Sequence, residues 1–182
     1  EDKKYPKNYR PIALLNVDYK ILSKTLANIL VDTLPNIINK DQFCMKGRFI
    51  GDLIQEIMGI INYQRAENKP SFLAMLDFEK AFDSVNHQFT FDVMKAFNIP
   101  EEFIRWASLA FIDTQACCII NGKQSNFFDL PGGGRQGDNL YPLIFTIVVQ
   151  ALNHMINSTT TQGIELPNGT IKKIGQYADD ST

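Results

Sequence analysis

Apolar residues recur at helical spacing in five segments of the chain, and each segment is bounded by residues that start or end helices. Asp18 stands where a helix-capping carboxylate is favourable, and Pro100 suits a first helical turn. Pro142 is compatible with a helix only near its start. The pattern predicts helices over residues 18–34, 52–63, 87–97, 101–111 and 137–157.

Between these helices lie shorter apolar runs that indicate strands. Residues 71–78 are almost continuously apolar, which is typical of a central strand covered on both faces. Asn121-Gly122 and Pro167-Asn168-Gly169 each separate two such runs and predict hairpins. The order of elements lacks the regular alternation of a doubly wound sheet. It favours an α+β fold with a ferredoxin-like antiparallel sheet and helices on one face.

Composition narrows the class of protein. A chain of 182 residues with 45% hydrophobic content can bury one core. No apolar run is long enough to span a bilayer, so we expect no membrane partner. The three cysteines are odd in number and lack zinc-ligand spacing. They indicate reduced thiols in an intracellular protein, with nucleus and cytoplasm both open.

The formal net charge of −2 is unusual for a protein that binds nucleic acid, since such proteins generally carry a basic face. The charge is reconciled with nucleic-acid binding if basic surfaces lie elsewhere in a larger protein. The chain has no initiator Met and stops two residues after an acidic pair. We therefore interpret it as a fragment, and its oligomeric state stays open.

Carboxylates stand at the ends of two predicted strands. Asp77 stands at the end of the stretch Phe72–Asp77, and Asp179 and Asp180 follow Tyr177-Ala178. Acidic groups that converge need cations to offset their repulsion, and Mg²⁺ prefers oxygen ligands of this kind. Two such ions can hold the attacking and leaving oxygens of a phosphoryl displacement. The residues therefore favour nucleotidyl transfer.

Three motifs occur in an informative order: LDFEKAFDSV at 76–85, GRQGDNLYPLIF at 134–145 and YADD at 177–180. Together they resemble the palm of reverse transcriptases, most closely those of non-LTR (LINE-type) retrotransposons. Residues 8–16 and 41–52 resemble the fingers motifs of that group. The resemblance implies a right-hand polymerase with a fingers-like segment over 1–70 and a palm over 71–182, incomplete at its C-terminus and without a thumb.

The resemblance also implies a metal site and its substrates. The family's catalytic metal ligands correspond to Asp77, Asp179 and Asp180, which would hold two Mg²⁺ ions, with Mn²⁺ as a substitute. The implied partners are an RNA or DNA template with its primer and deoxynucleoside triphosphates. Asp83, the other acid of the first motif, is interpreted as a turn or helix-start carboxylate. We expect the 182-residue polypeptide by itself to be inactive.

Further residues correspond to the family's nucleotide pocket. Phe82 resembles the sugar gate, whose ring excludes a 2′-hydroxyl, although core packing is the alternative for any Phe. Gln136 and Gly137 resemble the two neighbouring residues that, in the family, lie over the incoming nucleotide and the template base. Asp138 departs from the usual LINE-type pattern, and an acid beside a triphosphate would be unfavourable. The run Gly132-Gly133-Gly134 predicts a loose loop, because glycine adds backbone entropy.

Basic residues in the fingers-like segment complete the implied site. Arg10 resembles the arginine that folds over the triphosphate, since a guanidinium matches phosphate oxygens. Lys46 and Arg48 resemble contacts to the template backbone. For all three, a solvated surface charge is the alternative.

Two other functions stay open on the sequence alone. One is a reverse transcriptase of the group II intron or retron type, although those tend to carry Pro before Gln-Gly, where this chain has Arg135. The other is a non-catalytic, nucleic-acid-binding remnant of a retroelement. The intact Asp77, Asp179 and Asp180 count against the remnant.

Overall fold

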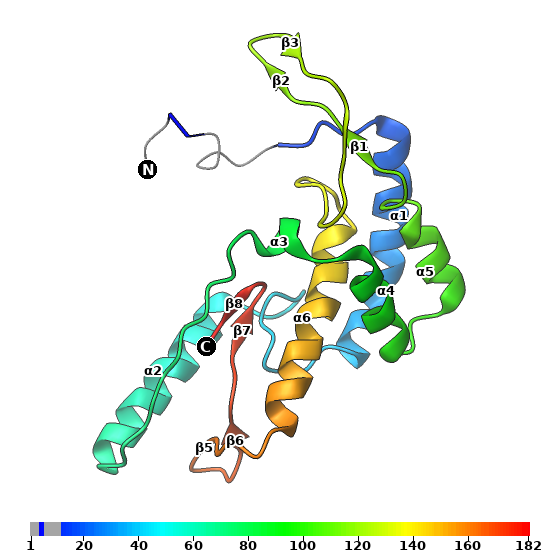
Figure 1. Ribbon diagram of the computed structural model, residues 1–182. Coiled ribbons are helices and arrows are strands. Elements are labelled where there is room, and N and C mark those ends of the chain that lie inside the picture. Colours follow the sequence, from blue (N-terminus) through cyan, green and yellow to red (C-terminus); the bar gives the residue numbers. More distant parts are fainter. Residues whose placement is uncertain (1–3, 6–11) are drawn as a thin grey trace. The chain divides into compact units, whose positions relative to one another are not determined.

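The computed structural model describes residues 4–5 and 12–182, and Figure 1 shows the arrangement of its elements. The predicted helices are confirmed, although α5 ends earlier and α6 begins later than the sequence pattern indicated. The helices are α1 (Val17–Thr33), the short 3-10 helix η2 (Leu34–Asn36), α2 (Ile50–Ala66), α3 (Ala81–Ser84), α4 (His87–Ala96), α5 (Glu101–Ser108) and α6 (Tyr141–Ser158).

The strands of the described residues form four separate antiparallel pairs. These are β1 (Gln115–Ala116) with β4 (Phe128–Asp129), β2 (Ile119–Ile120) with β3 (Lys123–Gln124), β5 (Ile164–Glu165) with β6 (Ile171–Lys172), and β7 (Gln176–Tyr177) with β8 (Asp180–Ser181). Both predicted hairpins are confirmed, and the mixed helix and strand content is that of an α+β fold. The continuous ferredoxin-like sheet stays a prediction.

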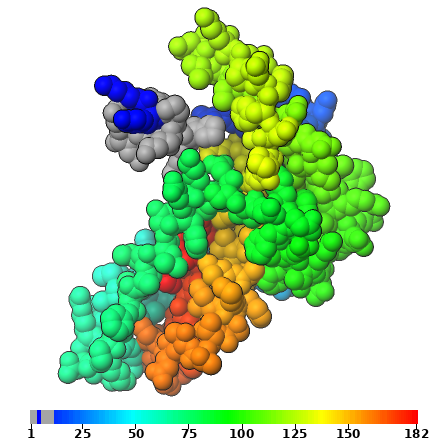
Figure 2. Space-filling model, viewed as in Figure 1, coloured from blue at the N-terminus to red at the C-terminus, as the bar shows by residue number. Residues whose placement is uncertain are grey.

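The expectation that residues 71–78 are buried on both faces is wrong. The Phe72 side chain is 100% exposed and that of Met75 is 78% exposed, and residues 70–80 form part of the surface in Figure 2. Within this run only Leu76 makes a β-bridge, to Ser181. An apolar run is covered on both faces only where neighbouring strands extend the sheet and helices pack over it. The described residues supply one bridge and no such cover.

The chain forms two compact units that interleave in sequence. The first combines residues 4–5 and 12–30 with Phe82–Ile144, and the second combines Val31–Ala81 with Phe145–Thr182. Each unit is therefore assembled from segments far apart along the chain.

The core of the first unit is aromatic and aliphatic. The Met94 and Ala107 side chains of α4 and α5 are fully buried, and the Phe111 ring lies 5.8 Å from that of Phe91 and 5.7 Å from that of Tyr141. Helix α4 begins cleanly because the Asn86 side chain accepts a hydrogen bond from the third residue of the helix. The aromatic cluster thus joins α4, the segment just after α5 and the first residue of α6.

The core of the second unit mixes apolar and polar side chains. Ile147 on α6 is fully buried, while the Lys172 ammonium lies 2.8 Å from the carboxylates of both Asp41 and Glu56. Asn153 and Gln176 are also fully buried, and their side chains bond each other at 3.0 Å. Each of these buried polar groups has a partner, as burial requires. Within the described ranges, no helix is long and apolar enough to cross a bilayer.

Candidate active site

One antiparallel bridge brings the two acidic strand ends together. The Leu76 N–H donates to the Ser181 carbonyl at 2.8 Å, and the Ser181 N–H donates to the Leu76 carbonyl at 3.2 Å. Because the bridge is antiparallel, Asp77 comes to lie opposite Asp180. The structure therefore places two of the three predicted metal-binding aspartates side by side along the backbone.

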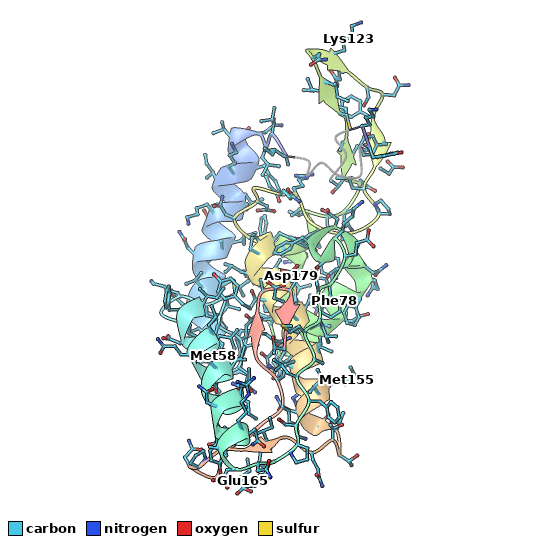
Figure 3. All side chains as sticks on the ribbon, turned by 90° about the vertical axis from the view of Figure 1, so that its left-hand side faces the viewer. Met58, Phe78, Lys123, Met155, Glu165 and Asp179 are labelled. Carbon is cyan, nitrogen blue, oxygen red and sulfur yellow. The ribbon has the colours of Figure 1, made fainter. Side chains whose placement is uncertain are left out.

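The third aspartate stands at the turn of the β7–β8 hairpin, where Figure 3 labels it. Ala178 and Asp179 form the turn, and Ala178 adopts a φ of 53°. That left-handed conformation is unfavourable by about 1–2 kcal/mol for a residue with a Cβ. Asp179 is half-buried, whereas Asp77 and Asp180 are exposed. The hairpin thus presents both acids of the YADD motif from a strained turn.

The three aspartates have the right donor chemistry for Mg²⁺, which prefers carboxylate oxygen. Nevertheless, in residues 4–5 and 12–182, no three Asp, Glu, His or Cys side chains gather closely enough to hold a metal ion. The backbone therefore aligns Asp77 with Asp180, but the side chains do not form a closed ligand set.

The loop of residues 41–44 borders the hairpin turn. The Gln42 amide bonds the backbone of Ala178, and Cys44 lies near the turn as well. Burial raises the pKa of the Cys44 thiol, a hydrogen bond with the Ala178 backbone opposes the rise, and the Asp179 carboxylate adds to it. The thiol therefore stays protonated. Sequence reasoning missed Gln42, because nothing local links it to a turn so far along the chain.

Phe82 lies in α3, in the first unit, with its backbone firmly held. Its carbonyl accepts hydrogen bonds from the Tyr141 hydroxyl at 2.8 Å and the Gly134 N–H at 3.0 Å. Its ring meets the Tyr141 ring edge-on, with the centroids 5.9 Å apart. Burial, and secondarily the nearby Asp83 carboxylate, raise the pKa of Tyr141. Tyr141 therefore remains a hydrogen-bond donor to the Phe82 carbonyl at neutral pH.

The glycine loop packs tightly against this segment, so the prediction of a loose loop is wrong. Gly133 has a φ of 72°, and its N–H donates to the Val85 carbonyl at 2.8 Å. A Cβ on Gly133 would lie 2.5 Å from the Asp83 backbone, and one on Gly134 would lie 2.0 Å from the Tyr141 ring. Glycine is required at position 133 by the close approach of the Asp83 backbone, and at position 134 by the close approach of the Tyr141 ring.

Gln136 and Gly137 follow this loop and are accessible. Gly137 is exposed with a φ of 99°, and the Gln136 carbonyl accepts a hydrogen bond from the Ala13 N–H at 3.3 Å. Both residues are therefore at least partly accessible to a ligand, and the backbone conformation at position 137 favours glycine.

Asp138, the departure from the usual LINE-type pattern, is buried and hydrogen-bonded within the protein. Its carboxylate accepts a hydrogen bond from the Tyr19 hydroxyl at 2.5 Å, another from the Ser23 hydroxyl, and a third from the Leu140 N–H at 2.9 Å. Burial first, and then the bond to Asp138, raise the pKa of Tyr19, which keeps its hydroxyl a donor. The Arg135 guanidinium stacks 4.7 Å from the Tyr19 ring. Asp138 thus ties the start of α6 to α1.

The basic residues predicted to contact nucleic acid differ in their surroundings. The Arg48 guanidinium donates to the carbonyls of Asn39 and Gln42, each at 2.5 Å, and so holds the loop before α2. Lys46 is exposed at the tip of that loop. Arg10 lies outside the described residues. Of the two basic residues that the structure describes, Lys46 is exposed, whereas the Arg48 guanidinium is bonded to loop carbonyls.

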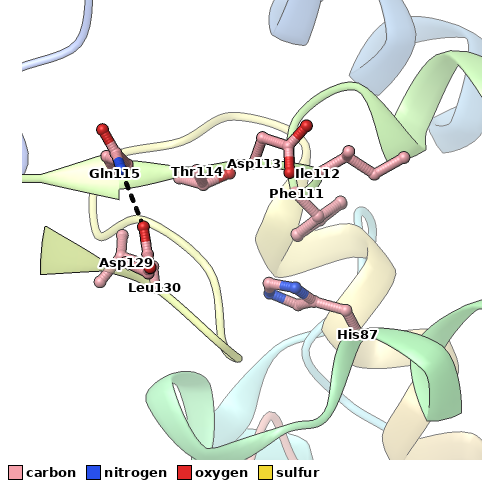
Figure 4. A pocket seen from close by; sticks show the side chains of 8 residues that line it. All are labelled: His87, Phe111, Ile112, Asp113, Thr114, Gln115, Asp129 and Leu130. Atoms are coloured by element: carbon pink, nitrogen blue, oxygen red, sulfur yellow. Dashed lines mark hydrogen bonds between the residues drawn. The ribbon is translucent and has the colours of Figure 1, made fainter.

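A cavity of about 700 Å³ opens in the first unit, and Figure 4 shows the residues that line it. The His87 ring borders the cavity and its Nε2 lies 2.8 Å from the Gly133 carbonyl. Gln115 donates to the Asp129 carboxylate at 2.9 Å on another side. None of the predicted site residues lines this cavity.

Comparison with known proteins decides the family. The profile described as reverse transcriptase (RNA-dependent DNA polymerase) matches residues 2–182. The chain belongs to the reverse transcriptase family. The resemblance to the non-LTR, LINE-type enzymes is also confirmed, because the relatives below are proteins of such elements. Members of the family generally use divalent metal ions and act on a template–primer with deoxynucleoside triphosphates.

The relatives include the following two, which match almost the whole chain. The "Transposon TX1 uncharacterized 149 kDa protein" of Xenopus laevis is 27% identical over 181 residues, which are 98% of this chain and 14% of the relative. The Pol polyprotein from the type-2 retrotransposable element R2DM of Drosophila melanogaster is 27% identical over 186 residues, 97% of this chain and 16% of the relative. The chain thus spans about a seventh of the length of these relatives.

The packing of the glycine loop gives a prediction with a matched control. Gly133→Ala and Gly122→Ala both place a Cβ at positive φ, but only the first brings that Cβ against backbone, since nothing lies within 4 Å at Gly122. Gly133→Ala should therefore lower the free energy of unfolding by roughly 1–3 kcal/mol more than Gly122→Ala does, as overpacking usually does. Urea denaturation measures the difference. Equal losses would contradict the close approach at Gly133.

Proposed function

We propose that the protein that carries this chain is an RNA-directed DNA polymerase, which extends a primer 3′-hydroxyl on an RNA or DNA template. Membership of the reverse transcriptase family supports the reaction. The Leu76–Ser181 bridge supports the assignment of particular residues, because it sets Asp77 opposite Asp180 beside the YADD turn.

The proposed metal ligands are Asp77, Asp179 and Asp180, with two Mg²⁺ ions and Mn²⁺ as a substitute. When bound, such ions favour the alkoxide form of the primer hydroxyl and neutralise charge on the triphosphate. The protein's part is to hold the carboxylates in place. The bridge aligns Asp77 and Asp180 by their backbones, and both side chains are exposed, so core packing does not restrict their rotamers.

The proposed architecture is a palm over residues 71–182 with a fingers-like segment over 1–70. In the palm, we propose that residues 71–78 and the β7–β8 hairpin belong to one ferredoxin-like antiparallel sheet. The antiparallel bridge between Leu76 and Ser181 supports this pairing, since it joins the two segments in the required direction.

The proposed nucleotide pocket contains Arg10, Phe82, Gln136 and Gly137. Phe82 is proposed as the sugar gate because its carbonyl is fixed by two hydrogen bonds while its side chain keeps partial exposure. A ring on a fixed backbone can exclude a 2′-hydroxyl by contact alone. Gln136 and Gly137 are accessible beside the start of α6.

Lys46 and Arg48 are proposed to contact the template backbone. The exposure of Lys46 supports its part. The Arg48 guanidinium already donates hydrogen bonds to loop carbonyls. It would therefore favour template binding through its positive charge and by holding the loop in place. We also propose an intracellular location, because nucleic acid and deoxynucleotides are found inside the cell.

A second candidate is a non-catalytic, nucleic-acid-binding remnant. The departure from the usual LINE-type pattern at residues 138–141 favours it. The retention of all three aspartates favours the polymerase. The relatives from TX1 and R2 elements favour the LINE-type branch over the group II intron or retron type.

The metal-ligand proposal predicts that Asp77→Asn and Asp179→Asn each abolish primer extension by the full-length protein while folding is retained. Each change removes the negative charge that holds a cation but leaves the side-chain volume unchanged. The measurement is incorporation rate in Mg²⁺, with circular dichroism as the check on folding.

Asp83→Asn is the matched control, because Asp83 lies in the same motif but outside the proposed ligand set. It should keep near wild-type incorporation. Near wild-type rates for Asp77→Asn or Asp179→Asn would overturn the assignment, and a wild-type protein with no synthesis would favour the remnant.

The sugar-gate proposal predicts that Phe82→Val sharply raises ribonucleotide incorporation while deoxynucleotide use falls only modestly. The smaller side chain relieves the clash with the 2′-hydroxyl, whereas Phe82→Tyr keeps the ring and should keep the discrimination. The ratio of kcat/KM for a matched deoxy- and ribonucleotide pair reports this difference in transition-state binding. An unchanged ratio in Phe82→Val would show that Phe82 is a core residue.

A further inference from the structure

The turn that carries the YADD aspartates is held by the buried side chain of Gln42. The Ala178 N–H donates to Gln42 Oε1 at 3.0 Å, and Gln42 Nε2 donates to the Ala178 carbonyl at 3.3 Å. Gln42 is 0% exposed, so no water competes for these bonds. One amide thus satisfies both backbone groups of the residue whose φ of 53° is unfavourable.

Gln42 is itself fixed in orientation. Its Oε1 also accepts the Cys44 N–H at 3.0 Å, and the Arg48 guanidinium binds its carbonyl at 2.5 Å. On either side of Gln42, the backbone pairs with β7: the Phe43 N–H donates to the Gln176 carbonyl at 2.7 Å, and the Gln176 N–H donates to the Asp41 carbonyl at 2.8 Å. The amide therefore approaches the turn from a rigid support.

A second buried amide holds the strands below the turn. Gln176 Nε2 donates to the Ser181 hydroxyl across the hairpin at 3.0 Å, and Gln176 Oε1 accepts from Asn153 of α6 at 3.0 Å. Ser181 is the residue that bridges to Leu76. Gln176 thus fixes the strands, and Gln42 fixes the turn. The specific role of Gln42 is therefore to hold the conformation of Ala178.

We propose that Gln42 is a positioning residue for the polymerase reaction: it holds Ala178 in its left-handed conformation and so orients Asp179 and Asp180. The inference rests on the proposed function of those two aspartates. A buried glutamine could instead serve stability alone. The two roles can be told apart. A positioning role affects kcat and depends on the φ of Ala178. A purely structural role affects only the stability of the fold.

The test compares Gln42→Met with Gln150→Met in the full-length protein. Gln150 is a matched control: it is 4% exposed and its Oε1 accepts the Asn39 N–H at 3.0 Å, so its loss also removes a buried backbone contact. Gln42→Met should lower kcat for primer extension roughly 10- to 100-fold, the scale that small misplacements of reacting groups produce. The KM for deoxynucleotide should change less than about threefold, which corresponds to about 0.7 kcal/mol. Gln150→Met should keep kcat near the wild-type value at a similar loss of melting temperature.

The second arm uses Ala178→Gly. Glycine adopts positive φ without the Cβ penalty, so the fold-loss in kcat from Gln42→Met should be smaller in the Ala178→Gly background than in the wild-type background. Hydrogen exchange of the segment that contains Ala178 supplies a readout that does not need activity. Exchange should accelerate in Gln42→Met and remain slow in Gln150→Met.

The outcomes are distinct. Equal kcat in Gln42→Met and Gln150→Met, or an equal fold-loss in both backgrounds, would overturn the positioning role. Near wild-type activity in Asp179→Asn would instead overturn the proposed function, whatever Gln42 does. If Gln42→Met does not fold, Gln42→Asn against Gln150→Asn decides. Asparagine keeps a neutral amide but is one methylene shorter, so at position 42 it cannot bond both backbone groups of Ala178 at hydrogen-bond distance, and kcat should fall at position 42 alone.

Discussion

The candidate active site depends on one short backbone pairing, the antiparallel bridge between Leu76 and Ser181. Within the described chain, residues 71–78 make no other β-bridge. The two hydrogen bonds of this bridge set Asp77 opposite Asp180. Acidic groups repel one another, so no attraction between the side chains can bring them together without cations. Backbone pairing does so, because its strength does not depend on the charge of the side chains.

The support for this pairing is polar and buried. Gln42, Asn153, Gln176 and Ser181 are all at most 2% exposed, and each has a hydrogen-bond partner in the hairpin or beside it. Apolar packing is non-directional, whereas an amide must meet its partner at a defined distance and angle. Directional contacts therefore suit a hairpin whose turn has to present two aspartates from an unfavourable backbone conformation.

The first unit uses the same kind of constraint around Phe82. The Tyr141 hydroxyl and the Gly134 N–H fix the Phe82 carbonyl, and Gly133 has room only for a hydrogen where it meets the Asp83 backbone. Asp138 extends the arrangement, because its carboxylate binds α1 and the start of α6. A departure from the usual LINE-type motif is thus a structural anchor in this chain.

The sequence by itself determined the helices, both hairpins and the family, because helical periodicity, Asn-Gly turns and ordered motifs are all local signals. It also selected Asp77, Asp179 and Asp180 as candidates. Only the tertiary structure decided that residues 71–78 are exposed, that Asp138 is buried, that the glycine loop is tight and that Gln42 holds Ala178. Those outcomes arise from partners far apart along the chain, and no local pattern encodes which distant backbone group a buried side chain will meet.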